Sequence, residues 1–358
     1  MKRLECLDGL RGVLAVYVML SHMAPFAAIP AWIARPLSHG GAAVDVFFIL
    51  SGLVIVRSLE GFGYRARPFL TARVVRLVPA YLPVLALAMA VQVLPITFEQ
   101  MPWIATGSPA REIWSDGWPR HWLAYALTHL TMTHGLIPNG VLPDAWVGFL
   151  GAAWSLSTEC QFYLLALLLI PRCGLSPLPW LGLGLLGLGW QALAPEAWHF
   201  SRAFLPNKAF YFALGIASAA GGPRYGATLV AVLGLCWVQG GIGKLIAPLL
   251  WTLCLAAQHQ PDRPGLAQAA AVLRAPMLQR LGALSYAIYL ANEPVQKWLG
   301  VTLARLAGED PLLFTILWVP GAIGLPLLLA VWVHHRIEMP AMRWARARRA
   351  DPARPLRI

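Results

Sequence analysis

Charged side chains are scarce in this chain of 358 residues. Asp, Glu, Lys and Arg make up 12% of it and hydrophobic residues 58%, whereas a soluble globular protein typically carries about 25% charged residues. So few charges cannot cover a water-facing surface, and the apolar composition excludes a disordered chain, a collagen-like repeat and a nucleic-acid-binding domain. The excess of Leu, Ala, Gly and Trp is typical of a helical protein with several membrane spans.

Paired cysteines are also lacking. The five cysteines form no Cys-x-x-Cys pair, their number is odd, and four lie in or beside apolar runs. Neither a disulfide framework nor a metal site is indicated, and we expect all five to be small apolar packing residues. They are Cys6, Cys160, Cys173, Cys236 and Cys254.

Ten apolar segments reach or approach the length of about 20 residues that a bilayer span requires. We interpret the first as a retained helix and not as a signal peptide, because Glu5 and Asp8 precede it and its apolar stretch is long. The segments are centred near residues 10–30, 40–57, 77–95, 156–171, 177–194, 205–220, 225–240, 243–258, 282–301 and 312–333.

Basic residues indicate the orientation of these spans. With a cytoplasmic N-terminus, inner segments hold 19 of the 28 Lys and Arg and outer segments hold eight, while Arg11 lies at the mouth of the first helix. We therefore expect an all-α membrane protein, with ten transmembrane helices in one bundle and both termini cytoplasmic. Residues 1–340 are the expected membrane domain, and 341–358 a basic cytoplasmic tail near anionic lipid that does not bind nucleic acid.

The one long outer segment, residues 96–145, joins the third and fourth spans. Loops of this length are usually functional or disordered, and the aromatic content argues against disorder. Tryptophan at this height suits either the membrane interface, which we favour, or a surface that stacks on sugars. The segment contains Trp103, Trp114, Trp118, Trp122, His121, His129 and His134.

Several polar residues fall within the first two spans, where a charge at mid-bilayer costs about 2.5–3.5 kcal/mol. Arg11 and His22 are eleven positions apart and so share one helix face, roughly 16 Å apart along the axis. Asp45, on the returning helix, falls near the depth of His22. A carboxylate there could fix the imidazole tautomer and raise its basicity; alternatively, each residue is satisfied separately within the bundle.

Arg73 and Arg76 are three positions apart at the cytoplasmic start of the third span, so on a helix they face the same way. They are either positive-inside anchors or, with Arg11 at the same level, part of a site for a multiply charged anion, since guanidinium binds two phosphate oxygens at once. A ligand with phosphates at one end and a reacting group roughly 15–18 Å away fits this spacing. Coenzyme A thioesters have that shape.

Five motifs follow one another between residue 7 and about 340. They read Leu-Asp-Gly-Leu-Arg-Gly at 7–12, followed by His22; Gly-Ala-Ala-Val-Asp-Val-Phe-Phe-Ile-Leu-Ser-Gly at 41–52; Arg-Val-Val-Arg-Leu-Val-Pro at 73–79; Trp-Ser-Leu-Ser-Thr-Glu at 154–159; and Leu-Ser-Tyr-Ala-Ile-Tyr-Leu at 284–290. Together they resemble the motifs of the acyltransferase 3 family of integral-membrane acyltransferases.

The resemblance implies a ten-helix O-acyltransferase of the bacterial inner (plasma) membrane. Such an enzyme moves an acyl group, usually acetyl, from cytoplasmic acyl-CoA to a hydroxyl of an extracytoplasmic glycan such as exopolysaccharide, O-antigen or a lipid-linked precursor. The implied acyl-CoA-binding residues are Arg11, Arg73 and Arg76. The implied catalytic residues are His22 as base or acyl carrier, Asp45 as its partner and Glu159 as a further acid, and the polar supports are Ser51, Tyr286 and Asn292.

Asn292 departs from the family pattern, in which a His often stands two residues before Pro. Asn can hold a hydrogen bond but cannot act as a base. Glu293 could compensate, but Lys297 four residues on favours an ion pair at the outer surface.

Glu159 has a structural alternative, as an acid in the first turn of the fourth span that the helix dipole favours, with Ser155 or Ser157 as the cap. The developing negative charge of acyl transfer also needs a hydrogen-bond donor, for which Ser51 and Asn292 are candidates. Direct transfer and transfer through an acyl-histidine both stay open.

A membrane transporter or flippase is the alternative hypothesis, because intramembrane Arg, His and Asp also form relays and substrate paths. Transporters often show two halves with paired broken helices. We find no such repeat, and the polar residues concentrate in the first third of the chain. A glycan polymerase is a weaker hypothesis, because its function does not explain why three arginines lie near the cytoplasmic side of the bundle.

Overall fold

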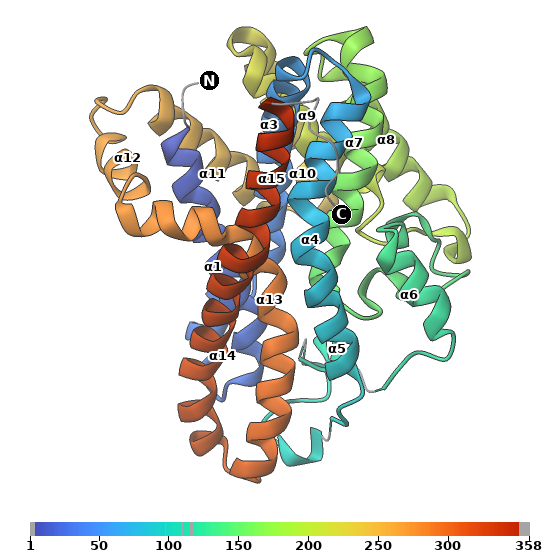
Figure 1. Ribbon diagram of the computed structural model, residues 1–358, viewed down its shortest axis with the longest axis vertical. Helices are drawn as coiled ribbons and strands as arrows, with labels where there is room; N and C mark the ends of the chain where they lie inside the picture. The colour runs from blue at the N-terminus through green and yellow to red at the C-terminus, as the bar shows by residue number, and fades with distance from the viewer. Residues whose placement is uncertain (1–3, 97, 109, 115–116, 351–358) are drawn as a thin grey trace.

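The computed structural model describes residues 4–96, 98–108, 110–114 and 117–350, and within these ranges it is a helical bundle (Figure 1). The single extended pairing among them is an isolated antiparallel bridge between Pro138 and Phe200. The longer helices are α1 (Glu5–Met23), α3 (Gly40–Gly61), α4 (Ala66–Gln92), α7 (Trp154–Cys173), α8 (Leu178–Leu193), α10 (Gly222–Gly240), α11 (Ile242–His259), α13 (Pro276–Ala307) and α14 (Pro311–Val333). The shorter ones are α2 (Ala31–Leu37), α5 (Ala110–Ile113), α6 (Trp122–Leu130), α9 (Ala209–Ala220), α12 (Ala267–Leu273) and α15 (Met339–Ala350).

All ten predicted segments fall on helices, but in the described residues six helical stretches combine the length and apolar character that crossing a membrane requires. α9, with 12 residues, is about 18 Å long, which is short of the hydrocarbon thickness of about 30 Å. The count of ten spans and the cytoplasmic position of both termini therefore remain predictions. The six stretches are Glu5–Phe26, Ala31–Gly61, Ala66–Gln92, Gly151–Cys173, Ile242–His259 and Pro311–Ala347.

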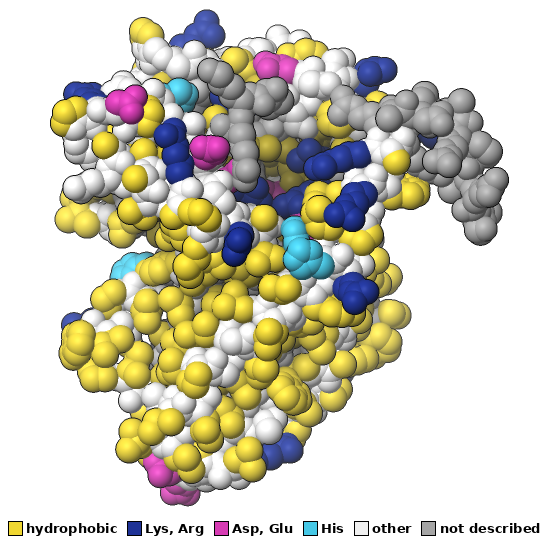
Figure 2. All heavy atoms as spheres, turned by 60° about the vertical axis from the view of Figure 1, so that its left-hand side comes forward, with side chains coloured by type: hydrophobic (Ala, Val, Ile, Leu, Met, Phe, Trp, Pro, Cys, Tyr) yellow, Lys and Arg dark blue, Asp and Glu magenta, His cyan; other side chains and the backbone are white. Residues whose placement is uncertain are grey.

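The surface agrees with a bilayer environment. Figure 2 shows hydrophobic side chains covering most of the lower part of one face, while Lys and Arg side chains gather toward its upper end. Exposed Leu, Val, Ile and Trp side chains such as Leu186, Leu193 and Val238 occur on several helices. A water-facing surface would not expose so much contiguous apolar area.

Glycines let α1 and α13 lie against each other (Figure 1). A side-chain carbon added at Gly12 would stand 2.7 Å from the backbone nitrogen of Gly282 on α13, and one added at Gly282 would stand 2.1 Å from the carbonyl oxygen of Asp8 on α1. One added at Gly9 would meet α12, 1.9 Å from the carbonyl oxygen of Leu273. Small residues at such crossings allow helix backbones to approach closely within a membrane. This contact explains the glycines of the first motif and fixes Arg11 relative to α13.

The long segment 96–145 is packed against the helices. Trp114 is 2% exposed and stacks on Phe26 with ring centroids 3.6 Å apart, so it is a core residue and not part of the interfacial belt that we expected. Trp118 and Trp122 are 41% and 43% exposed and remain available to an interface. The indole Nε1 of Trp118 donates to the carbonyl of Met89, which ties the segment to the end of α4.

Two histidines of this segment are completely buried and stack on each other, with ring centroids 4.3 Å apart. His129 Nε2 lies 3.0 Å from the carbonyl oxygen of Ala145, and His134 Nε2 lies 3.1 Å from that of Ala153. Burial lowers the pKa of His134 to about 4. Burial and the neighbouring His134 lower the pKa of His129 well below its ordinary value, so both rings are neutral at neutral pH.

At the C-terminal end, α14 passes through a π-helical turn, His334–Glu338, into α15. α15 packs against α4 (Figure 1). The predicted basic tail, 341–358, thus begins within a helix that lies on the bundle, and its last residues, 351–358, lie outside the described residues.

Candidate active site

Three arginines meet in the wall of one cavity. The cavity has a volume of about 170 Å³ and is bounded by α1, α3, α4, α7 and α13. Arg11 comes from α1, Arg73 and Arg76 come from α4, and Glu159 comes from α7. The predicted convergence of the arginines is confirmed, because two elements far apart in the sequence bring them to one wall. That they bind CoA remains a prediction.

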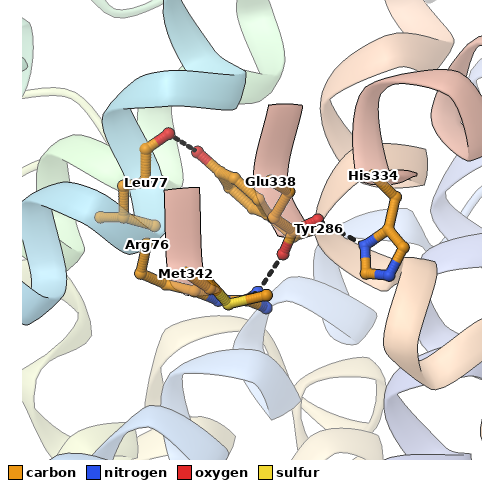
Figure 3. Close-up of polar contacts among 6 residues, drawn as sticks. All are labelled: Arg76, Leu77, Tyr286, His334, Glu338 and Met342. Atoms are coloured by element: carbon orange, nitrogen blue, oxygen red, sulfur yellow. Dashed lines mark hydrogen bonds and ion pairs between the residues drawn. The ribbon is translucent and has the colours of Figure 1, made fainter. Parts of the chain in front are cut away.

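Arg76 is held by a carboxylate that the sequence did not single out. It forms an ion pair with Glu338, whose side chain is completely buried, and its guanidinium lies over the ring of Tyr286 at 5.6 Å (Figure 3). Glu338 Oε2 also lies 2.8 Å from His334 Nδ1. The Tyr286 hydroxyl in turn donates to the carbonyl of Leu77 at 2.8 Å, which holds its ring beneath Arg76.

The π-helical turn accounts for the position of Glu338. Such turns occur frequently at functional sites, because the extra residue per turn shifts the side chains that follow. Here the turn spans His334–Glu338 and points both of its end residues at each other. The sequence offered one sign of this role, because Glu338 is a single acidic residue in the arginine-rich stretch that follows the last apolar span.

Arg11 and Arg73 keep donors that the protein does not use. Among the described residues, Arg11 has no hydrogen-bond or ion-pair partner, although the charges of Arg76, Asp8, Glu159 and Glu338 act on it. Arg73 Nη2 donates to Ser58 Oγ at 3.2 Å, while its buried Nε has no partner. Both side chains are partly buried, and a bound anion would offset the cost of leaving such donors unpaired.

Glu159 lies in the same cavity and accepts two hydroxyl hydrogen bonds, one from Ser51 and one from Tyr163 at 2.8 Å. α7 begins at Trp154 with no side-chain cap, so Glu159 is not in the first turn. The expected capping role of Ser155 or Ser157 is therefore wrong. Ser51, which we expected to support the reaction, is a partner of Glu159.

His22 is joined to Asn292 and not to a carboxylate. Its Nδ1 lies 2.7 Å from Asn292 Oδ1. Asn292 Nδ2 donates to the carbonyls of Ile288 at 3.2 Å and Tyr289 at 2.6 Å, which uses both amide hydrogens. The amide must therefore present its oxygen to His22, and the imidazole donates from Nδ1.

Comparison with known proteins assigns the chain to a family. A model of the family described as "Acyltransferase domain" matches residues 4–335, nearly the whole chain. The chain belongs to the acyltransferase 3 family.

A curated relative supports a membrane acyltransferase. The protein named "Putative membrane-bound transacylase BcsY" of Komagataeibacter xylinus is 29% identical over 215 residues, which are 58% of this chain and 49% of the relative. The chain thus matches about half the length of that relative. No solved structure matches.

The position of Asp45 corrects one expectation for this acyltransferase. Asp45 is 2% exposed, and its Oδ1 accepts from Lys208 Nζ at 2.6 Å while its Oδ2 lies 3.8 Å from Lys244 Nζ. The predicted pairing of Asp45 with His22 is wrong. Counting residues along two helices fixes the depth of each side chain but not the direction in which it faces.

Glu293 corrects a second expectation. Its carboxylate accepts from the backbone N–H groups of Gly151 and Ala152, each at 2.8 Å, and Lys297 instead donates to Gln92 Oε1 at 2.7 Å. The predicted Glu293–Lys297 ion pair is therefore wrong. Glu293 caps the segment that leads into α7, since a carboxylate satisfies amide groups at a helix start.

The cavity and His22 are separated by one helical turn. Tyr289 and Ser155 line the cavity, and His22 does not. Tyr289 stands three residues before Asn292 on α13, roughly 4.5 Å along the axis, and the Ser155 hydroxyl donates to its phenol oxygen at 2.9 Å. In the described part of the chain, no three His, Cys, Asp or Glu side chains gather as metal ligands.

Proposed function

We propose that this membrane acyltransferase transfers an acyl group, acetyl by the habit of its family, from cytoplasmic acyl-CoA to a hydroxyl of an extracytoplasmic glycan such as exopolysaccharide, O-antigen or a lipid-linked precursor. The observation that carries the proposal is the cavity wall in which Arg11 and Arg73 keep unused donors beside Arg76. The inner (plasma) membrane of a bacterium is the expected location, because acyl-CoA lies on one side and surface glycans on the other.

The arginines would bind the phosphates of the donor. Arg11 and Arg73 each offer N–H groups in a fork that matches two phosphate oxygens. Arg76 already carries the Glu338 carboxylate, so it contributes less positive charge than its neighbours. The slender arm of acyl-CoA would enter the cavity, with the nucleotide toward the expected cytoplasmic ends of α1 and α4.

His22 would act as the general base. With its Nδ1 hydrogen donated to Asn292, the neutral ring keeps a lone pair on Nε2. Nε2 takes the proton of the acceptor hydroxyl as the hydroxyl oxygen bonds to the thioester carbonyl carbon. When the carbon–sulfur bond breaks, the imidazolium returns that proton to the departing CoA sulfur, so protons and electron pairs balance.

A different residue would then stabilise the negative charge on the carbonyl oxygen. The Ser51 hydroxyl is donated to Glu159 and both amide hydrogens of Asn292 go to backbone carbonyls, so neither expected donor is free. The Tyr289 hydroxyl lines the cavity and accepts from Ser155, which leaves its own hydrogen for the carbonyl oxygen.

The test uses purified protein in lipid nanodiscs with labelled acetyl-CoA and a membrane extract that contains the acceptor. His22→Ala should fold and bind acetyl-CoA but transfer no label to glycan. Arg11→Ala should transfer label only when acetyl-CoA is raised well above its normal KM. Substantial transfer by His22→Ala would refute the mechanism. Absence of acetyl-CoA binding by the wild-type protein would refute the donor assignment.

The acyl-histidine route is tested in the same system without acceptor. A covalent intermediate predicts that labelled acetyl-CoA leaves label on the protein after denaturation, and that His22→Ala leaves none. Direct transfer predicts no protein-bound label while transfer to glycan proceeds.

A further inference from the structure

A second polar cluster, which the proposed mechanism does not use, surrounds Asp45. Lys208 and Lys244 both approach its carboxylate, at 2.6 and 3.8 Å. The charge of Arg202 also acts on Lys208. We call Asp45, Arg202, Lys208 and Lys244 the cation cluster.

The cation cluster carries more positive charge than its own carboxylate can neutralise. Lys208 is 8% exposed, and Asp45 offsets the cost of burying its ammonium. Lys244 shares the same carboxylate at the longer distance, with a side chain that is 41% exposed. One carboxylate against three cations leaves a formal surplus of two positive charges.

Arg202 supplies the clearest unused donors of the cluster. Its guanidinium lies over the ring of Trp146 at 4.8 Å and within 6.0 Å of the Trp154 ring centroid. Among the described residues it has no carboxylate partner, and the residue is exposed. The contact with Trp146 restrains the guanidinium, and its exposed N–H groups can bind a carboxylate or phosphate with two hydrogen bonds.

The cluster lies one aromatic layer from the cavity. The Trp154 ring lies near both Arg202 and Lys208, whose Nζ is 5.7 Å from its centroid, and it contacts Phe48 with centroids 5.5 Å apart. Phe48 lines the cavity, and so does Ser155, which follows Trp154 in the sequence. The two buried rings of Trp154 and Phe48 separate the cluster from the cavity, and a ligand at the cluster would leave the arginine wall unoccupied.

In the predicted topology, the cation cluster lies at the outer end of the bundle, and the arginines proposed to bind acyl-CoA lie toward the cytoplasmic end. Asp45, Lys208 and Lys244 stand at or near the starts of α3, α9 and α11, which all enter from the outer side if the N-terminus is cytoplasmic. Arg202 lies in the outer connection between α8 and α9. This is the side from which a glycan acceptor would arrive.

We infer that the cation cluster binds an anionic group of the acceptor, a glycan carboxylate or the phosphate of a lipid-linked glycan. The inference rests on the proposed function and narrows its acceptor to acidic glycans. Lys244 and Arg202 make the contact, Lys208 and Asp45 form its buried base, and the half-buried Trp146 lies beside the bound sugar. The anion positions the acceptor hydroxyl toward the cavity.

The experiment measures binding to the full-length protein in nanodiscs without any acyl donor. The carboxylate probe is an oligogalacturonate, its neutral control is the fully methyl-esterified form, and the phosphate probe is inorganic pyrophosphate. The acid should bind at least tenfold more tightly than its ester, and Lys244→Gln and Arg202→Gln should each weaken binding about fivefold or more. Arg202→Lys should retain part of the affinity. The matched control Arg305→Gln, an exposed arginine on α13, should bind as the wild type does.

The possible results distinguish a glycan carboxylate from a lipid-linked phosphate as the bound anion. They also distinguish failure of this inference from failure of the acyl-CoA assignment. Tight binding of pyrophosphate that both variants weaken would assign the cluster to a lipid-linked phosphate. Tight binding of the oligogalacturonate would assign it to a glycan carboxylate. Equal binding of acid and ester together with no pyrophosphate binding, or unchanged binding in both variants, would overturn the inference. Acetyl-CoA binding, measured in parallel, should be unaffected by Lys244→Gln, so failure of the donor assignment would be seen independently.

Discussion

Asn292 Oδ1 lies 2.7 Å from His22 Nδ1, and both amide hydrogens of Asn292 are donated to carbonyls of its own helix. The amide therefore cannot turn over without leaving two hydrogen bonds, and it imposes one tautomer on the imidazole. An uncharged residue here performs the orienting task that we had predicted for Asp45. The departure of Asn292 from the family pattern thus preserves a partner for His22.

Asn292→Ala is expected to lower kcat about 10–100-fold while the KM for acetyl-CoA changes less than twofold, because it removes the orientation of the base and not the donor site. Steady-state kinetics with labelled acetyl-CoA measures both. Gln296→Ala is the control: within the described residues this buried amide, one turn further along α13, bonds only the backbone carbonyls of Met19 and Ala322. It should lower thermal stability with little effect on kcat. Equal kcat losses in both variants would contradict an orienting role for Asn292.

Arg11→Ala is expected to weaken acetyl-CoA binding about 10–100-fold, the loss of one charge-assisted phosphate contact of about 1.5–3 kcal/mol. Because Arg11 has no described protein partner, its removal should not reduce thermal stability. Isothermal titration and thermal unfolding measure the two quantities. Tight binding by Arg11→Ala would exclude this guanidinium from the donor site.

Glu338→Gln is expected to lower the free energy of unfolding by about 1–3 kcal/mol, since it leaves the Arg76 guanidinium, 25% exposed, without its carboxylate. Adding Arg76→Gln should recover most of that stability, because the two partners act as a unit. Thermal unfolding of the wild type, both single variants and the double variant gives the coupling. Additive losses would mean that the ion pair contributes little to stability.

Asp45→Asn tests whether Asp45 serves as the ion-pair partner of Lys208 and not as the partner of His22. The substitution leaves the buried ammonium of Lys208 unpaired and should lower thermal stability, and adding Lys208→Met should restore it. The measurement is again thermal unfolding in nanodiscs. If Asp45→Asn kept full stability and lost only transfer of label, a direct role at His22 would be supported instead.

The stacked histidines predict a loss of stability in acid. The folded pKa of His134 is lowered to about 4 by burial, whereas an unfolded His titrates at about 6.5. The unfolded state therefore binds more protons between these values. The free energy of unfolding is therefore highest, with respect to His134, above about pH 6.5. It falls as the pH drops toward 4, by up to about 3 kcal/mol.

Hydrogen exchange of residues 122–136 at pH 7.5 and pH 5 measures this effect. Exchange should be faster at pH 5, after correction for intrinsic rates, in the wild type and in His121→Gln, an exposed control in the same segment. It should depend less on pH in His134→Gln. Equal pH dependence in all three proteins would show that the buried pair does not control local opening.

Spacing and hydropathy by themselves determined the helical class and where the apolar helices lie, because span length and side-chain depth depend only on distance along the chain. They also singled out Arg11, Arg73 and Arg76, since a charge in or beside an apolar run must be satisfied somewhere, whereas Glu159 came from the resemblance to the family motif. Only the tertiary structure decided which partner satisfies each one. Asp45 pairs with Lys208, His22 with Asn292 and Arg76 with Glu338. These pairings depend on the rotation of each helix about its axis and on the π-helical turn. Residue spacing along the chain does not determine the direction in which a side chain points.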